Sequence, residues 1–115
     1  MPFGFIEDLK KEAVNNPEAK GAYKRVPLGP DQGWDSHIMR VFDLDAGGYT
    51  PKHVHDWPHI NYILEGEGTL LVDGEVREVK FGNYAYIPAN TEHQFKASAD
   101  KPLKFMCIIP KEALY

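Results

Sequence analysis

The sequence predicts a single all-β domain, folded as an antiparallel barrel or sandwich. The chain has 115 residues, close to the commonest size for one domain. From residue 22 onward, short segments of alternating polarity are separated by glycine, proline and asparagine turns. The hairpin signal Asp73-Gly74 lies between two of them. Many short strands with closely spaced turns are typical of this fold class.

At the N-terminus, the segment 5–15 places apolar residues at roughly helical spacing, with Phe5, Ile6 and Leu9 among them. Asn16-Pro17 would end such a helix. We therefore expect a helical arm over residues 1–20 and a barrel over residues 21–115. A frayed terminus is the alternative for the arm. The expected strands cover residues 22–26, 37–44, 60–64, 68–73, 75–79, 84–88, 92–97 and 103–109.

Composition and charge narrow the possible partners and location. The net charge is −4, and no cluster of lysine and arginine could follow a phosphate backbone, so nucleic acid is not expected. No apolar run approaches the ~20 residues of a membrane span. The N-terminus is charged within ten residues and lacks an apolar signal core. With a single cysteine, no internal disulfide can form, and we expect a cytoplasmic protein.

Four of the five histidines have spacings that suit a metal site. His53 and His55 share one face if their segment is extended, and a bend can return His59 to the same side. His93 follows a proline turn farther along the chain. Neutral imidazole is the commonest nitrogen ligand of transition metals. Surface histidines near a loop are the alternative, but the His-x-His pair with a third histidine close by favours a metal.

Two segments resemble the motifs of the cupin family. Residues 47–66, "GGYTPKHVHDWPHINYILEG", carry a glycine, five residues, His-x-His, three residues, His59, six residues and a glycine. Residues 82–97, "GNYAYIPANTEHQFKA", carry a glycine, five residues, Pro-x-Asn, two residues and His93. The resemblance implies a jelly-roll barrel, a double-stranded β-helix. It also implies one divalent transition metal, whose identity among manganese, iron, zinc, nickel and copper stays open, with the ligands His53, His55, His59 and His93.

Three positions depart from the family pattern. His59 stands where the family has an acidic ligand, Asn90 replaces a glycine, and Ala97 replaces the final asparagine. Asn90 tolerates a left-handed turn, and position 97 is not a ligand. Four neutral imidazoles leave the full +2 charge on the ion, which favours M(II) over M(III) and acidifies bound water. The activity of oxalate-degrading cupins is therefore not carried over.

Strand alternation suggests which residues line the pocket. Phe95 shares a face with His93, and Phe105, Cys107 and Ile109 share a face with one another. Alternation alone does not fix which face of the last strand is inward. The resemblance to four-histidine cupins favours Phe105, Cys107 and Ile109.

Three further residues are candidates for the site. Arg40 could reach the cavity and bind a carboxylate or enolate, although a solvent-facing arginine paired with an acid is the alternative. Cys107 could act chemically, although a buried small hydrophobic residue is commoner. Trp57 could shape the pocket mouth or could simply plug it.

The function predicted is that of a metal-dependent, dioxygenase-like oxidoreductase acting on a small organic substrate that chelates the metal. A non-catalytic module that binds or senses a metal or small ligand is the alternative. A metal-free isomerase or epimerase fits poorly, because a base needs one histidine and the chain offers four at ligand spacing. We also expect a homodimer, because exposed edge strands need cover, and segments 22–26 and 103–110 suit strand exchange across a twofold axis.

Overall fold

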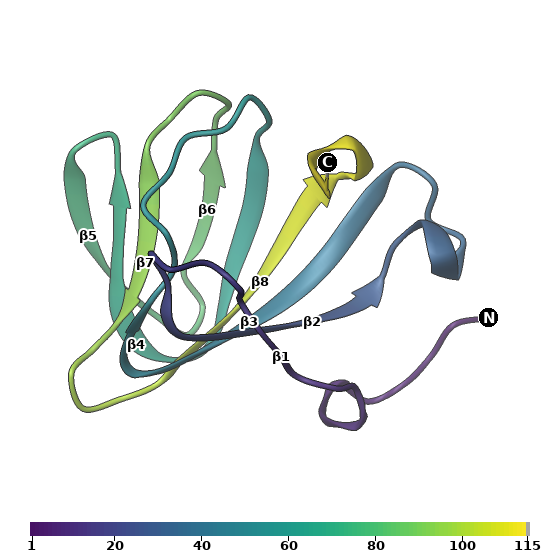
Figure 1. The fold of residues 1–115 in the computed structure, drawn as a ribbon, viewed down its shortest axis with the longest axis horizontal. Helices are drawn as coiled ribbons and strands as arrows, with labels where there is room; N and C mark the ends of the chain where they lie inside the picture. Colours follow the sequence, from purple (N-terminus) through teal and green to yellow (C-terminus); the bar gives the residue numbers. More distant parts are fainter. Residues whose placement is uncertain (115) are drawn as a thin grey trace.

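The structure is a computed structural model that describes residues 1–114, and it is all-β (Figure 1). Its strands are β1 (Glu12–Ala13), β2 (Lys20–Leu28), β3 (His37–Tyr49), β4 (His59–Val72), β5 (Glu75–Lys80), β6 (Tyr84–Ile87), β7 (His93–Ala97) and β8 (Leu103–Pro110). Short 3-10 turns cover Ile6–Asp8, Pro30–Gln32 and Lys111–Leu114.

The strands close into an antiparallel barrel. β3 pairs with β8, β8 with β4, β4 with β7, and β7 returns to β3, so these four strands form a complete ring. β2, β5 and β6 extend this ring, and β1 adds to β2. Figure 1 shows β4 to β7 on one side of the barrel and β2, β3 and β8 on the other. The predicted fold class is confirmed.

The predicted N-terminal helix is wrong. Only Ile6–Asp8 makes a 3-10 turn, and the chain then runs extended into β1, which pairs with β2. Isolated helices shorter than about 12 residues are marginal in water, so nothing local favours a helix strongly here. Pairing with β2 satisfies the backbone of β1 instead, and Arg25 Nε donates to the carbonyl of Leu9 at 3.1 Å. Helical spacing was therefore a misleading signal.

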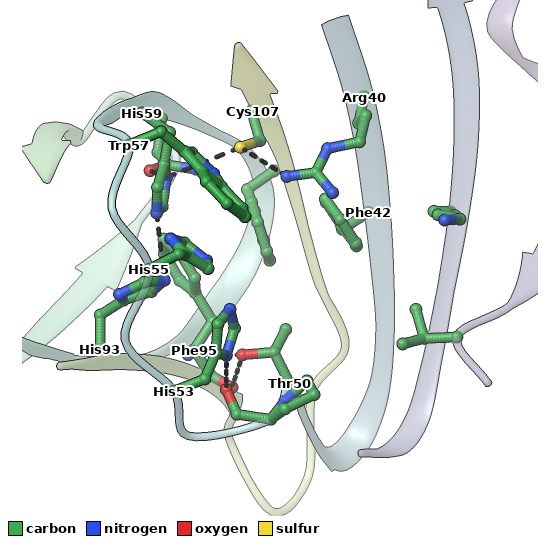
Figure 2. A pocket seen from close by; sticks show the side chains of 15 residues that line it. Arg40, Phe42, Thr50, His53, His55, Trp57, His59, His93, Phe95 and Cys107 are labelled. Carbon is green, nitrogen blue, oxygen red and sulfur yellow. Dashed lines mark hydrogen bonds between the residues drawn. The ribbon is translucent and has the colours of Figure 1, made fainter. Parts of the chain in front are cut away.

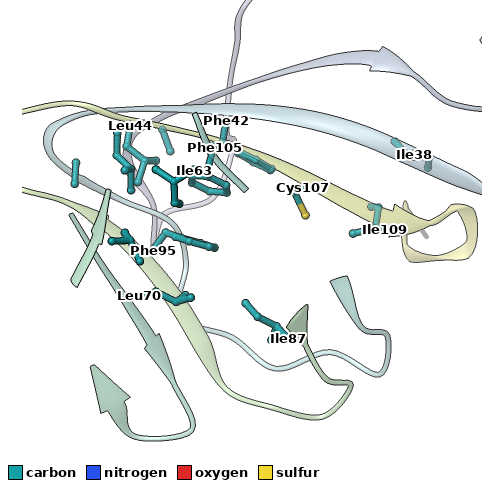
Figure 3. Packing of buried hydrophobic residues seen from close by; sticks show 14 residues of the cluster. Ile38, Phe42, Leu44, Ile63, Leu70, Ile87, Phe95, Phe105, Cys107 and Ile109 are labelled. Atoms are coloured by element: carbon teal, nitrogen blue, oxygen red, sulfur yellow. The ribbon is translucent and has the colours of Figure 1, made fainter. Parts of the chain in front are cut away.

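The core lies between the two sides of the barrel and is centred on three stacked aromatic rings (Figure 3). Phe105 packs between Phe95 and Phe42, with ring centroids 4.0 Å and 5.2 Å away. Alternate residues of β8 are buried, which puts the Phe105 side of this strand inward. The same three rings also line a cavity that lies beside the histidines.

The turn between β4 and β5 has the backbone conformation that its two residues, Asp73 and Gly74, favour. Asp73 and Gly74 both have positive φ, 49° and 81°, as the mirror-image turn between two antiparallel strands requires. The hairpin predicted from these two residues is confirmed.

Across residues 1–114, no helix has the length and apolar character needed to cross a membrane.

Candidate metal centre

The four histidines come from one loop and the beginnings of two strands. His59 begins β4 and His93 begins β7, while His53 and His55 lie in the connection between β3 and β4. An isolated bridge joins His53 to His93 through two backbone hydrogen bonds of 3.2 Å and 3.1 Å. The amide of Asn90 donates to the His55 carbonyl at 2.7 Å. The backbone thus holds the two motifs together at one end of the barrel.

The structure brings all four imidazoles together (Figure 2). His53, His55 and His93 each offer a nitrogen, and these atoms lie within 4.8 Å of one another. His59 joins them through His93, because the two Nε2 atoms are 3.1 Å apart. The His55 and His59 rings have centroids 5.6 Å apart. The spacing that predicted this cluster therefore corresponds to a real convergence of side chains, and its metal binding stays a prediction.

Backbone carbonyls orient two of these rings. His53 Nδ1 lies 2.6 Å from the carbonyl oxygen of Pro51, and His93 Nδ1 lies 2.9 Å from that of Thr91. A carbonyl oxygen can only accept, so in each ring the proton belongs on Nδ1. Nε2 then carries a free lone pair. Metal-binding histidines commonly donate their second N–H in this way, which fixes the tautomer.

A buried amide orients His59. Its Nδ1 lies 2.7 Å from Asn61 Oδ1, and Asn61 Nδ2 donates to the carbonyl of Met106 at 3.4 Å. The Met106 carbonyl requires the amide nitrogen on its side, so the amide oxygen faces the imidazole. His59 must therefore donate from Nδ1, which leaves its Nε2 with a lone pair.

The donor set fits a cation. With protons on both Nδ1 atoms, the Nε2 lone pairs of His59 and His93 face each other at 3.1 Å with no proton between them. Two such lone pairs repel, and a positive ion bound by both removes the repulsion. Four imidazole donors without a thiolate or carboxylate suit zinc, copper, iron or nickel.

The pKa values of His55, His59 and His93 keep these three imidazoles neutral near pH 7. Burial, followed by the neighbouring imidazoles, lowers the pKa of His59 to about 3 and that of His55 to about 4. Burial also lowers the pKa of His93. Neutral imidazole is the form that binds metal, so near pH 7 these three rings are ready to act as ligands.

A small cavity of about 220 Å³ lies beside the histidines. It is smaller than the roughly 300–1,000 Å³ of a typical ligand site, so it suits a small ligand. Of the predicted site residues, all four histidines, Arg40, Trp57, Phe95, Phe105 and Cys107 line it. Ile109 does not. It is buried in the core on the same face of β8 as Cys107, but one step farther along the strand, where it pairs with Ile38.

Arg40 and Cys107 lie next to each other on the cavity wall. Arg40 Nη2 donates to Cys107 Sγ at 3.4 Å, and this sulfur lies 3.6 Å from His59 Nδ1. The guanidinium also sits over the ring of Phe42, 4.9 Å from its centroid. Burial raises the pKa of the Cys107 thiol, so the group is a neutral thiol rather than a nucleophilic thiolate.

Trp57 covers one of the ligands. Its indole stacks on the His55 ring with centroids 4.3 Å apart and planes 8° from parallel. The tryptophan therefore restricts the rotation of this imidazole. Trp57 was predicted to shape or plug the pocket mouth. The stacking on His55 adds a second role, that of positioning a candidate ligand.

Sequence reasoning missed three polar residues of the site, Asn61, Thr50 and Lys24. Thr50 lines the cavity, and its Oγ1 accepts from the amide of Phe95 at 3.0 Å. Asn61 lies two residues after His59 on β4, so it shares the inward face of that strand. Strand alternation from His59 would have identified Asn61. No comparable signal marks Thr50.

Residues 40–109 match the model of the Cupin domain family. The chain is a cupin. The solved structure of the polyketide cyclase RemF from Streptomyces resistomycificus is similar to it, with a TM-score of 0.91 and 30% identity, over 96% of this chain and 80% of that one. Residues 40–109, which match the family model, include all four histidines of the cluster.

Two curated relatives are similar over part of their length. An uncharacterized protein from Methanocaldococcus jannaschii is 42% identical over 56% of this cupin and 52% of its own length. An acireductone dioxygenase from Leptospira biflexa is 27% identical over 80% of this cupin and 56% of its own length. The chain thus spans about half the length of these curated relatives.

Proposed function

We propose that this cupin is a metal-dependent enzyme in which His53, His55, His59 and His93 hold one divalent transition metal. Its substrate is a small organic molecule that chelates the metal, and its reaction is dioxygenase-like. One observation carries the proposal: the unprotonated Nε2 atoms of His59 and His93 face each other at 3.1 Å within a cluster of four imidazoles. Such an arrangement is unfavourable without a cation.

The residues around the cluster have separate tasks in this proposal. A bound metal would supply Lewis acidity and, if redox-active, chemistry with dioxygen. Asn61 and Trp57 keep two ligand rings oriented. Phe95 and Phe105 give the cavity an apolar wall that excludes water from the substrate. The similarity to an acireductone dioxygenase supports an oxygen-dependent reaction on an enediol-like substrate.

A redox-neutral ring closure is the second candidate, and two observations favour it. The structure of the polyketide cyclase RemF is similar to this one over 96% of the chain, with a TM-score of 0.91 and 30% identity. A ligand set without a carboxylate also leaves the ion its full +2 charge, which favours polarisation of a carbonyl over oxidation of the metal. A module that only binds or senses a metal or small ligand remains the non-catalytic alternative.

Metal analysis and oxygen uptake test these candidates together. Elemental analysis of the purified protein should find about one transition metal per chain. Oxygen uptake is then measured with a panel of enols, diols and keto acids, and each reaction is repeated without oxygen. Uptake that depends on metal and substrate supports the dioxygenase. Product formed equally well without oxygen supports ring closure, and tight binding without turnover supports the binding module. Absence of bound metal after loading would refute both enzyme candidates and leave only a module that binds a small ligand.

A further inference from the structure

Two buried hydrogen-bond donors in the described residues lack a partner, and both line the cavity beside the histidines. They are Arg40 Nε and Trp57 Nε1. A buried polar group left unpaired costs about 1–3 kcal/mol, so native proteins rarely keep one without a reason. Both groups are donors only, so what completes them is an acceptor. Their shared location indicates that a ligand of the cavity supplies it.

The charges that line the cavity are all positive. Arg40 and Lys24 are its two cationic residues, and the lining includes no aspartate or glutamate. The ion pairs found among residues 1–113 involve Arg25, Lys52, Arg77, Lys101 and Lys104, but not Arg40. The alternative of a solvent-facing arginine paired with an acid is therefore wrong. A partly buried guanidinium without a carboxylate partner is a site for an anion.

Arg40 is held in a fixed direction. In Figure 2 its guanidinium extends from β3 toward Cys107 and the histidine side of the cavity. Its stacking on Phe42 and its bond to Cys107 Sγ restrict the side chain without using Nε. A planar fork held in this way matches a carboxylate, which can accept two parallel N–H bonds.

We propose that Arg40, assisted by the indole N–H of Trp57, binds a carboxylate of the substrate beside the metal. The substrate is then an anion with two ends: one chelates the metal, and a carboxylate is held by Arg40. This inference rests on the proposed function, since the first end needs a bound metal. It identifies Arg40 and Trp57 as the residues that determine specificity for charge.

The test uses ligands that differ only at the second end. The protein is loaded with cobalt(II), whose visible absorption reports ligand exchange at the metal. It is titrated with the monohydroxamates of malonic, succinic and glutaric acid, in which the hydroxamate chelates and a carboxylate remains free. The corresponding hydroxamates with a terminal amide are the neutral comparison. We expect at least one carboxylate ligand to bind about 10-fold or more tightly than its amide, as hydrogen bonds to a charged group allow.

Three variants assign this preference to its residues. Arg40→Gln should abolish the preference while leaving the affinity for the amide ligands unchanged, and Arg40→Lys should keep part of it. Trp57→Phe keeps the stacking on His55 and should weaken only the carboxylate ligands, by several-fold. Arg77→Gln is the matched control, because it removes the same charge from an exposed position on β5 outside the cavity, and it should keep the preference.

The outcomes separate this inference from the proposed function. Equal affinity for carboxylate and amide ligands in the wild type would refute the carboxylate site and leave the open metal centre standing. A preference that survives in Arg40→Gln would refute the role of Arg40. If no hydroxamate changes the cobalt spectrum, the metal centre is closed to chelating ligands, and both proposals are wrong.

Discussion

Asn61 shows how one buried amide can decide the state of a metal ligand. It is 1% exposed and connects the His59 imidazole to the backbone of β8 through Met106. The histidine spacing alone gave the four candidate ligands. It could not give the tautomer, because the partner of each Nδ1 comes from the folded chain. For His53 and His93 these partners are backbone carbonyls, which no side-chain pattern reveals.

Replacement of Asn61 should weaken metal binding without removing a ligand. Asn61→Leu leaves His59 Nδ1 without an acceptor and should lower metal affinity by about 10- to 100-fold. Asn61→Asp keeps an acceptor at Oδ1 and should retain most of the affinity. Competition with a chelating dye measures both. Equal affinity in the leucine variant and the wild type would show that this hydrogen bond does not orient a ligand.

Substitution of His59 tests the departure that sets this chain apart from the family pattern. His59→Glu should still bind metal, but the harder, charged ligand should move preference toward manganese and iron and away from copper and nickel. His53→Ala and His55→Ala should instead lose affinity, since nothing replaces the ligand. Elemental analysis after loading with an equimolar metal mixture compares the variants. If His59→Ala and His59→Glu both match the wild type, His59 is not a ligand.

The lowered pKa values predict how acid affects the metal-free protein. The pKa of His59 is about 3 and that of His55 about 4 in the folded chain, against about 6.5 in an unfolded one. Between these values the unfolded state binds more protons, so stability rises with pH. The contribution of His55 and His59 to the free energy of unfolding is therefore complete above pH ~6.5 and decreases as the pH falls below that value. Urea midpoints at pH 7 and pH 5 should show the loss, and His59→Gln should reduce it. Identical midpoints would contradict the burial of these groups.

The elements of the fold were predictable where local chemistry and tertiary pairing agree. Alternating segments predicted the strands, because one face of each is buried in the barrel. The N-terminal segment failed because pairing of β1 with β2 overrode a weak helical pattern. At the β6–β7 connection, Asn90 has φ 63°, which the replacement of a family glycine by asparagine predicted.

Asn90 therefore offers a prediction on the loop that carries His93. Asn90→Ala must keep the same left-handed backbone and should lower the free energy of unfolding by about 1–2 kcal/mol. Asn90→Gly relieves this cost and should remain close to the wild type. Urea unfolding of the metal-free proteins measures the difference. An alanine variant as stable as the glycine variant would mean that this loop rearranges freely, and the bond between Asn90 N and the His55 carbonyl would then not fix the ligand loops.

At the scale of the whole molecule, the barrel presents an apolar outer face that residues 1–114 leave exposed at its β6 and β4 end, whereas Val41 at its β3 end is only 3% exposed. Strand register aligns Tyr86, Ile60, Ile108 and Met39 in one row across β6, β4, β8 and β3, and Tyr84, Tyr62, Met106 and Val41 in the next. Tyr84, Tyr86 and Ile60 are 85%, 64% and 50% exposed. The rows contain no charged residue. Contiguous apolar surfaces of this kind usually mark an interface.

This face offers an alternative to the expected mode of dimerisation. Segment 103–110 cannot exchange with a partner through a free edge, because β8 pairs with β3 on one side and β4 on the other. β2 has β3 on one edge, but β1 covers only two residues of its other edge, Tyr23 and Lys24. Within residues 1–114, β8 therefore has no free edge for strand exchange, whereas most of the outer edge of β2 is unpaired. An uncharged, apolar sheet face can also pack on its own copy across a twofold axis.

We therefore predict a homodimer that packs through the β6-β4-β8 face and buries more than about 1,000 Å² in total. A charge placed at the centre of this face must lose its water on association, so Ile60→Lys should convert the dimer to a monomer near 13.0 kDa. Val76→Lys is the matched control, because Val76 is 64% exposed on β5 and lies outside both rows. Light scattering at matched concentrations reports the mass, and far-ultraviolet circular dichroism shows whether each variant is folded. A monomeric wild type would refute the dimer, and equal dissociation by both lysine variants would place its interface elsewhere.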